Sequence, residues 1–288
     1  MRDLNYQLKQ LCQHNRDGSY ATQSNRHDAL QKMAIDLHDL GYRGLQSRSL
    51  KQKHVDALIN KYKGEQLAIG TLKNRLAVLR WWAKKIGRPQ IVAKDNAHYN
   101  IGSRQLVAKE SKSQILDQQK LASITSPYIK MSLELQAAFG LRREEAIKFM
   151  PEYADQQDHI RLKSTWCKGG KERVIPIRTS AQIDLLNRAQ RLAGRASLIP
   201  PHLSYVQQMR CYEKQTVKAG LSKMHGLRHA YAQARYQELT GWQAPACGGP
   251  KSKQLTAEQK QSDLNARLII SRELGHEREQ ITASYLGR

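Results

Sequence analysis

Two short runs in the middle of the chain carry a clear β-strand pattern, and they limit the folds open to it. Ile160 and Leu162 alternate with basic residues, and the run Arg-Val-Ile-Pro-Ile at 173–177 follows the Gly169-Gly170 turn. Two such runs around a Gly-Gly turn predict a β-hairpin. Hydrophobic residues elsewhere recur mostly at helical spacing. The sequence therefore predicts a mainly α-helical protein with one small β-hairpin or sheet.

The first hundred residues contain three helical patterns. The first ends at Gly41, and the second follows Ser49, a residue type that favours helix N-caps. The third begins near Thr71 and ends at Gly87. Its polar faces are basic, which is ordinary for a solvated helix surface but also suits contact with phosphates. The candidate DNA-binding residues on this helix are Lys73, Arg75, Arg80 and Lys84.

Helical periodicity fades from Arg88 to about Ser113, where Pro, Asn and Gly residues interrupt it. This pattern is typical of an interdomain linker. We therefore predict a helical domain over residues 1–100, a linker over 101–113 and a second domain over 114–288. Helical patterns in the second domain cover about 114–124, 128–140, 142–149, 180–193, 204–219, 226–239 and 263–274. Residues 241–262, rich in Gly, Pro and Lys, predict an exposed loop.

The charge of the chain predicts a polyanionic partner. Lys and Arg number 48 against 25 Asp and Glu, a net charge of +23. The excess is spread along the chain, because residues 1–100 carry 18 basic and 8 acidic residues, and residues 101–288 carry 30 and 17. Solubility alone is better served by acidic residues, so nucleic acid is the favoured partner. Neither a long apolar segment nor a signal or lipidation motif suggests a membrane partner.

The four cysteines, Cys12, Cys167, Cys211 and Cys247, are scattered along the chain. No pair has the spacing of a zinc site or a redox pair, so no metal site is expected. Scattered thiols without a secretion signal are typical of the reducing cytoplasm.

Several residues of the second domain have side chains suited to catalysis. A tyrosine, Tyr285, lies where chain ends are usually loose. Packing of the last helix would explain it, and so would a role as nucleophile. A phenol ionises only near pH 10, so a nucleophilic tyrosine needs cations and a base nearby. Candidates for these groups are Arg142, Lys168, His225, Arg228 and His276. Each of them alone has an ordinary structural interpretation.

Together and in this order, these residues resemble the tyrosine recombinases, the phage-integrase family. The shared features over about residues 115–285 are G-L-R-x-x-E at Gly140, a hairpin lysine, H-x-L-R-H at His225, L-G-H ending at His276, and a tyrosine nine residues later. The helical first domain is similar to the family's SAM-like core-binding domain. The resemblance implies a catalytic set of Arg142, Lys168, His225, Arg228, His276 and Tyr285, supported by Glu145.

The resemblance also implies an activity and its partners. The enzyme would be a site-specific recombinase, acting through a 3′-phosphotyrosine and needing no cofactor or metal. Its partner would be double-stranded DNA, bound by four chains on two sites, with a monomer in solution and accessory DNA-bending factors. A type IB topoisomerase and a non-catalytic DNA-binding protein on the same scaffold are the alternatives.

Two further expectations concern the hairpin and the end of the chain. Composition does not distinguish Lys168 from Lys171, but the resemblance selects Lys168, directly before the Gly-Gly turn, and leaves Lys171 as a phosphate contact. Family members usually continue past the tyrosine with a segment that docks on a neighbouring protomer, whereas three residues follow Tyr285 here. The 241–262 loop is longer than the family's usual connection.

Overall fold

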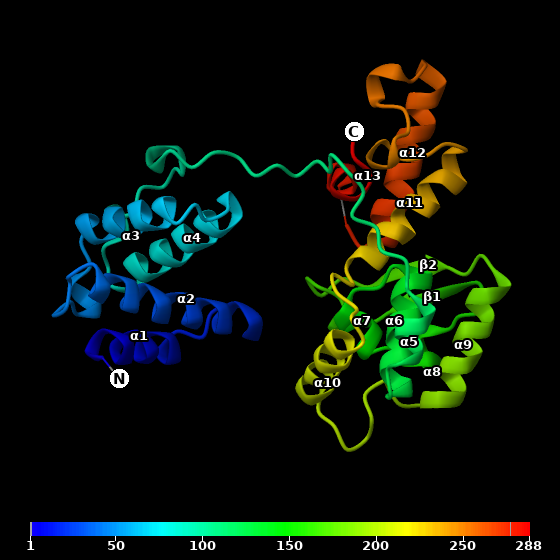
Figure 1. Ribbon diagram of the computed structural model, residues 1–288, viewed down its shortest axis with the longest axis horizontal. Helices are drawn as coiled ribbons and strands as arrows, with labels where there is room; N and C mark the ends of the chain where they lie inside the picture. The colour runs from blue at the N-terminus through cyan, green and yellow to red at the C-terminus, as the bar shows by residue number, and fades with distance from the viewer. Residues whose placement is uncertain (1, 277) are drawn as a thin grey trace. The chain divides into compact units, whose positions relative to one another are not determined.

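The computed structural model describes residues 2–276 and 278–288, and the chain divides into two units, residues 1–105 and 106–288. Each unit has its own buried hydrophobic residues. Figure 1 shows the helices and strands of both units. Helices dominate both units, and one antiparallel pair of strands lies in the described part of the second. The predicted fold class, mainly α with one small hairpin, is confirmed.

Helices α1 (Asp3–His14), α2 (Tyr20–Asp39), α3 (Gln52–Gly64) and α4 (Ile69–Lys85) build the first unit. The hydrophobic residues that predicted its helices are buried in its core, among them Leu30, Met33, Leu58 and Leu76. Helix α1, which the sequence did not predict, packs against α2. It buries only Leu4, Asn5 and Leu8, too few positions to make a clear helical pattern.

One prediction for the first unit is wrong. Ser49 lies in the 3-10 turn η1 (Ser47–Ser49), and α3 instead begins after Lys51, whose backbone N–H donates a 3.1 Å hydrogen bond to Nδ1 of His54. The stretch from Arg88 to residue 101, where helical periodicity fades, packs on the first unit. It contains the 3-10 turns η2 (Pro89–Ile91) and η3 (Ala97–Tyr99), and buried apolar side chains such as Tyr99 belong to the first core.

The second unit places helices around the hairpin. The helices are α5 (Gln118–Ala122), α6 (Pro127–Phe139), α7 (Arg143–Ile147), α8 (Pro151–Ala154), α9 (Ser180–Ala193), α10 (Tyr205–Lys218), α11 (Gly226–Thr240), α12 (Ala257–Glu273) and α13 (Ala283–Leu286). The 3-10 turns are η4 (Ser164–Trp166), η5 (Pro245–Cys247), η6 (Ser252–Gln254) and η7 (Glu279–Thr282).

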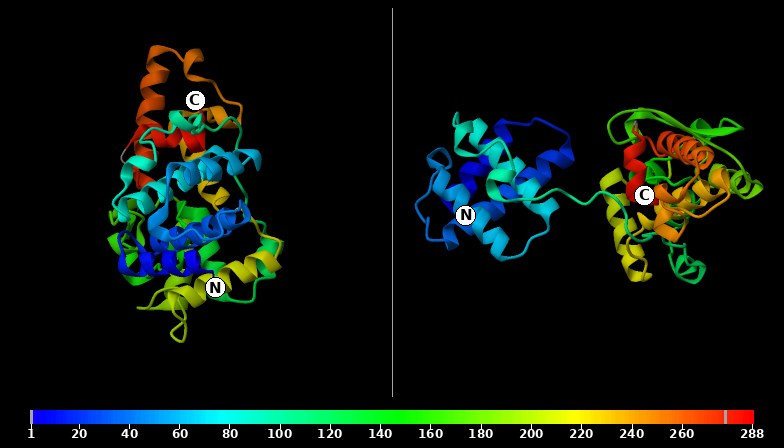
Figure 2. Two further views of the ribbon diagram at one scale, coloured as in Figure 1. Left: turned by 90° about the vertical axis from the view of Figure 1, so that its left-hand side faces the viewer. Right: turned by 90° about the horizontal axis from the view of Figure 1, so that it is seen from above.

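Strands β1 (His159–Leu162) and β2 (Arg173–Pro176) pair antiparallel, with Ile160 opposite Ile175 and Leu162 opposite Arg173. The alternation buries one face of the pair against the core. Strand β2 also contacts α12, and α12 in turn packs on α11. Helices α11, α12 and α13 lie together in the second unit (Figure 2).

Two helices of the second unit differ from their predicted extents. The pattern at 114–124 forms only the short α5, which begins after Asp117 caps Lys120 N–H at 3.0 Å. Helix α12 begins at Ala257, earlier than predicted, because Thr256 and Gln259 form a reciprocal capping box. The loop before α12 therefore covers 241–256 and contains η5 and η6.

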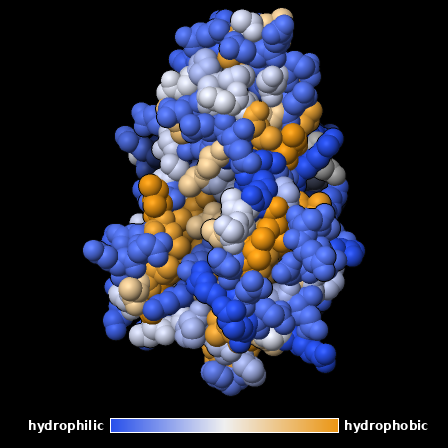
Figure 3. Space-filling view, turned by 90° about the vertical axis from the view of Figure 1, so that its right-hand side faces the viewer, coloured by the Kyte–Doolittle hydropathy of each residue, from blue (hydrophilic) through white to orange (hydrophobic). Residues whose placement is uncertain are grey.

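Figure 3 shows one face of the molecule, on which hydrophobic side chains form separate patches between hydrophilic ones. Within residues 2–276 and 278–288, no helix combines the length and the apolar character needed to cross a membrane.

Candidate active site

Arg142 and Glu145 form the first part of the site, at the turn between α6 and α7. Gly140 ends α6 in the left-handed conformation, and a Cβ atom there would lie 2.7 Å from the ring of Tyr231. Arg142 follows as the N-cap of α7. Glu145 Oε2 accepts a 2.6 Å hydrogen bond from the Arg142 backbone N–H, and Oε1 accepts a 2.8 Å bond from its guanidinium. One carboxylate therefore holds both the backbone and the side chain of Arg142.

Arg228 is a second cation, fully buried in the first turn of α11. Its guanidinium donates to the hydroxyl of Tyr285 at 3.3 Å, to the carbonyl of Gly140 at 2.6 Å and to the carbonyl of Leu274. Arg142 donates to the same Leu274 oxygen at 3.2 Å, so the two guanidinium groups share one acceptor. Burial lowers the pKa of Arg228 to about 10, and Arg142 adds to this effect. Arg228 therefore stays protonated at neutral pH.

Tyr285, on α13, has only 5% of its surface exposed. The rings of three histidines lie around it, at centroid distances of 4.7 Å for His229, 6.0 Å for His276 and 6.1 Å for His225. All the predicted catalytic residues except Lys168 thus meet in one cluster. His229 also belongs to it, although the sequence singled out only the first histidine of H-x-L-R-H.

The surroundings of these histidines favour their neutral forms. Burial lowers the pKa of His276 and of His229 to about 4, and Arg228 contributes in both cases. Burial, with Arg228 and Arg142, also lowers the pKa of His225. Among the described residues, Nε2 of His276 and Nδ1 of His229 are buried and lack a hydrogen-bond partner. Neutral imidazoles at this position can accept a proton from a phenol or bond to a phosphate oxygen.

Lys168 lies apart from this cluster, exposed in the turn between the strands. Its ammonium has no hydrogen-bond or ion-pair partner within the part of the chain that the structure describes. The adjacent Gly169 and Gly170 both have positive φ, 86° and 69°, values that glycine adopts readily. Lys171, also exposed, follows these glycines. Two exposed lysines thus flank the Gly-Gly turn.

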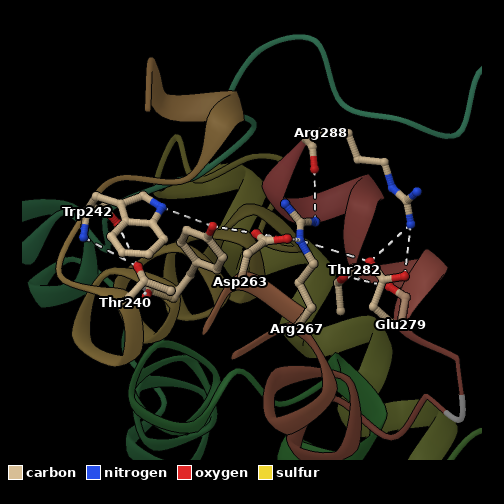
Figure 4. Close-up of polar contacts among 9 residues, drawn as sticks. Thr240, Trp242, Asp263, Arg267, Glu279, Thr282 and Arg288 are labelled. Carbon is tan, nitrogen blue, oxygen red and sulfur yellow. Dashed lines mark hydrogen bonds and ion pairs between the residues drawn. The ribbon is translucent and has the colours of Figure 1, made fainter. Parts of the chain in front are cut away.

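A network of polar side chains around Arg267 of α12 contacts the segment that carries Tyr285 (Figure 4). Arg267 is 3% exposed and pairs with Asp263 at 2.8 Å on its own helix. It also donates to the carbonyl of Gly287 at 3.0 Å and lies 4.0 Å from Glu279. Glu279 in turn pairs with Arg288 at 2.9 Å. Arg267 therefore contacts the chain on both sides of Tyr285 and helps to fix its position.

The segment before α5 also contacts the Tyr285 helix. The backbone N–H of Ala108 donates to the carbonyl of Ala283 at 2.9 Å. Ser111 donates to the side chain of Gln233 at 2.9 Å, and Gln233 donates to the carbonyl of Tyr285 at 2.9 Å. Residues predicted as linker thus help to hold α13. Their polar composition carries no signal of this role.

The basic residues of the first unit differ in how free they are to bind DNA. Arg80 donates to the carbonyl of Ala93 at 2.8 Å and to Asn96 at 2.9 Å, and therefore holds the loop after α4. Arg75 lies over the ring of Tyr62 and donates to its hydroxyl at 3.3 Å. Lys84 is exposed and Lys73 is partly buried. Phosphate contact by these four residues stays a prediction.

Solved structures of DNA recombinases share this fold. A lambda integrase dimer bound to a COC′ core site aligns with a TM-score of 0.62 at 16% identity, over 98% of this chain and 76% of that chain. XerH recombinase bound to its difH substrate gives 0.58 at 17% identity, over 98% and 80%. The Tn1549 transposon integrase in complex with circular intermediate DNA gives 0.54 at 12% identity, over 100% and 96%. The fold is that of a tyrosine recombinase.

Two family models identify the family within the tyrosine recombinases to which the chain belongs. The model described as "Phage integrase, N-terminal" matches residues 1–92, and the model described as "Integrase" matches residues 96–234, a range that includes Arg142, Lys168, His225 and Arg228. The chain belongs to the phage-integrase family of tyrosine recombinases. The search of curated proteins finds no match.

Proposed function

We propose that this protein is the site-specific recombinase of a mobile element such as a phage, a genomic island or a plasmid, and that it cuts and rejoins DNA with Tyr285. One observation carries the proposal: the buried Tyr285 hydroxyl accepts a hydrogen bond from Arg228, which shares an acceptor with Arg142. A tyrosine beside two fixed cations is suited to attack a phosphodiester.

In the first step, the Tyr285 oxygen attacks the phosphorus and the bond from phosphorus to the 5′-oxygen breaks. The negative charge of the pentavalent transition state falls on the non-bridging oxygens, to which planar guanidinium groups donate well. Arg142 and Arg228 supply these donors. His225, held neutral by its surroundings, accepts the phenol proton. The product is a 3′-phosphotyrosine and a free 5′-hydroxyl.

Two further residues complete the step. Lys168 donates a proton to the departing 5′-oxygen, and its exposed position in the turn leaves its ammonium accessible to DNA. His276 donates a hydrogen bond to a phosphate oxygen from Nε2, the ring nitrogen that has no partner among the described residues. The phosphotyrosine conserves the energy of the phosphodiester bond, so the 5′-hydroxyl of a second strand can reverse the reaction.

The proposed assembly is four chains on two double-stranded DNA sites, with accessory DNA-bending factors. Structural neighbours support it, because one is a lambda integrase tetramer bound to a Holliday junction, with a TM-score of 0.57. A recombinase of a prokaryotic mobile element would act on nucleoid DNA in the cytoplasm.

A pool of nicked duplexes with a randomised core would test the function. A nick close to the cleavage site releases a short strand with the 5′-hydroxyl, so the covalent adduct accumulates. We expect sodium dodecyl sulfate-resistant adducts to be enriched for one core sequence, and pairs of the selected duplex to exchange strands. Adducts without sequence preference, together with relaxation of plasmid DNA, would instead support a topoisomerase. A non-catalytic DNA-binding protein would form no adduct.

Binding of duplex DNA should weaken steeply as salt concentration rises. Each phosphate neutralised by Lys or Arg contributes about 0.9 to the slope of log affinity against log salt. With a net charge of +23, we expect at least about six such contacts, and hence a loss of roughly 10³-fold between 50 and 200 mM salt. Fluorescence anisotropy with a labelled duplex would measure the slope. Affinity that does not change with salt would contradict a phosphate-based interface.

A further inference from the structure

An arginine lies on the buried face of the hairpin, where the alternation of β2 calls for an apolar side chain. Arg173 is opposite Leu162 in the register and only 7% exposed. The next inward position of the same strand is the fully buried Ile175. Burying a guanidinium is unfavourable unless its charge and N–H groups are matched by partners. Its partners therefore indicate what the residue does.

All three guanidinium nitrogens of Arg173 donate hydrogen bonds to protein groups. Its two terminal nitrogens donate to the two carboxylate oxygens of Glu145, each at 2.7 Å, in a forked pair. Its Nε donates to the carbonyl of Glu273 at 2.9 Å, and Nη1 also lies 3.5 Å from Sγ of Cys167. The forked pair with the Glu145 carboxylate matches the charge of Arg173, whereas the hydrogen bonds of Arg228 go to two carbonyls and the Tyr285 hydroxyl. Arg173 therefore acts through its protein partners.

These partners belong to three different parts of the active site. Glu145 holds the backbone and guanidinium of Arg142. Glu273 directly precedes Leu274, whose carbonyl accepts from both Arg142 and Arg228. Cys167 is the neighbour of Lys168 in the turn. Arg173 thus connects the turn before α7, the end of α12 and the start of the hairpin turn.

The glycine before His276 fits the same contact. Gly275 has φ +67°, and a Cβ atom at this position would lie 2.9 Å from Cδ of Arg173 and 3.2 Å from its Nη1. A side chain there would therefore push the guanidinium away from Glu145 and Glu273. This close approach, together with the left-handed backbone, gives a physical reason for glycine in Leu-Gly-His.

We propose that Arg173 is a positioning residue of the active site, which orients Arg142 through Glu145 and fixes the end of α12 from which His276 follows. The measurement of adduct formation that tests this proposal rests on the proposed function. The measurement of protein stability that tests the coupling between Arg173 and Glu145 does not.

The charge state of Glu145 supports the proposal. Burial alone would raise the pKa of Glu145, but the hydrogen bonds and charge of Arg173, with the charges of Arg142 and Arg228, lower it to about 2. Because the folded pKa lies below that of the unfolded chain, ionised Glu145 stabilises the fold at neutral pH, and this stability is lost as pH falls towards 2. Removing Arg173 should raise the pKa of Glu145 in the folded protein, because burial raises this pKa and the hydrogen bonds and charge that lower it most would be lost.

The catalytic test compares Arg173→Gln and Arg173→Lys with Arg161→Gln on the selected nicked duplex. Arg161 is a suitable control because it lies on the same hairpin, in an exposed ion pair with Glu172. We expect Arg173→Gln to slow adduct formation by about 10²-fold or more at saturating protein, the loss produced by small misplacements of catalytic groups. DNA affinity should stay within about threefold. Arg173→Lys should recover only part of the rate, because an ammonium lacks the planar fork.

The second test needs no DNA substrate. Urea unfolding of the wild type and Arg173→Gln is followed between pH 4.5 and 8, and repeated with Glu145→Gln in both proteins. The stability difference between wild type and Arg173→Gln should shrink as pH falls, because Glu145 of the variant takes up a proton first. In the Glu145→Gln background the difference should lose most of its pH dependence, and what is left should come from His276, whose pKa Arg173 also lowers. Should Arg173→Gln not fold, the double variant Glu145→Gln/Arg173→Gln, which removes both charges of the forked pair, provides the rate measurement by comparison with Glu145→Gln alone.

The outcomes separate the two proposals. A wild type without adducts contradicts the proposed function, while the pH test still decides whether Arg173 controls Glu145. The positioning role would be overturned if folded Arg173→Gln formed adducts at the wild-type rate. It would also be overturned if, in proteins that retain Glu145, the stability difference between wild type and Arg173→Gln did not depend on pH. Equal losses in Arg161→Gln and Arg173→Gln would also overturn it, because they would indicate a general effect of hairpin charge.

Discussion

Tyr285→Phe is expected to abolish the covalent DNA adduct, a loss of roughly 10⁴-fold or more, since removing a nucleophile is among the most damaging changes to an enzyme. The ring should keep its place among the histidines, because it is buried and the hydroxyl accepts only a 3.3 Å bond from Arg228. Losing this acceptor of the buried Arg228 costs about 1–3 kcal/mol, so the protein should still fold and DNA binding should change little. Adduct gels and DNA-binding titrations would measure both effects.

A second buried tyrosine provides the control. Tyr212 on α10 is 3% exposed, and its hydroxyl accepts a 2.9 Å hydrogen bond from Gln136. Tyr212→Phe loses a comparable hydroxyl but should keep adduct formation near the wild-type rate. Adducts in Tyr285→Phe would show that another residue is the nucleophile, and the assignment of Tyr285 would then be wrong.

Lys168→Ala should slow cleavage of the normal phosphodiester by ~10²–10⁴-fold, the contribution typical of a general acid. The departing 5′-oxygen is a poor leaving group unless it receives a proton. A 5′-bridging phosphorothiolate departs as a thiolate and needs no proton. The sulfur substrate should therefore restore most of the rate of Lys168→Ala. Single-turnover cleavage of the two matched duplexes would measure this rescue.

Lys171→Ala is the matched control, since both lysines are exposed in the same turn. We expect a smaller loss for this variant, of the size of one phosphate contact, and no rescue by sulfur. Rescue of Lys171→Ala alone would move the general acid to the other side of the Gly-Gly turn. Rescue of neither variant would place the proton donor elsewhere, with His225 as the first candidate.

Local sequence patterns predicted much of the helical structure because amphipathic spacing and chain breaks are local properties. The prediction of a helix over 180–193 matches α9 (Ser180–Ala193), which has a capping box at Thr179 and Gln182. The Gly-Gly turn likewise located the hairpin. Patterns with few buried positions were less informative, as in α1. The pattern at 114–124 overestimated α5, because only a short stretch after Asp117 is helical.

Ordered motifs also predicted most members of the site cluster, because each lies at a turn or helix start with a recognisable sequence. Arg173, Arg267 and Gln233 had no such signal. An arginine in a basic hairpin or on a polar helix is ordinarily exposed, and its sequence does not reveal a distant carboxylate or carbonyl that would bury it. Arg173 and Glu273 are 100 residues apart in sequence, yet hydrogen bonded.

The helical class, the hairpin and the order of the reactive groups could be predicted because they follow from neighbouring residues and their spacing. Which of these groups meet depends on how the helices and strands pack. This packing places His229 beside Tyr285, aligns Arg142 and Arg228 on the Leu274 carbonyl, and buries Arg173 against Glu145. These contacts depend on packing between elements far apart in the chain, and hydrogen bonds require geometry that spacing along a sequence does not specify.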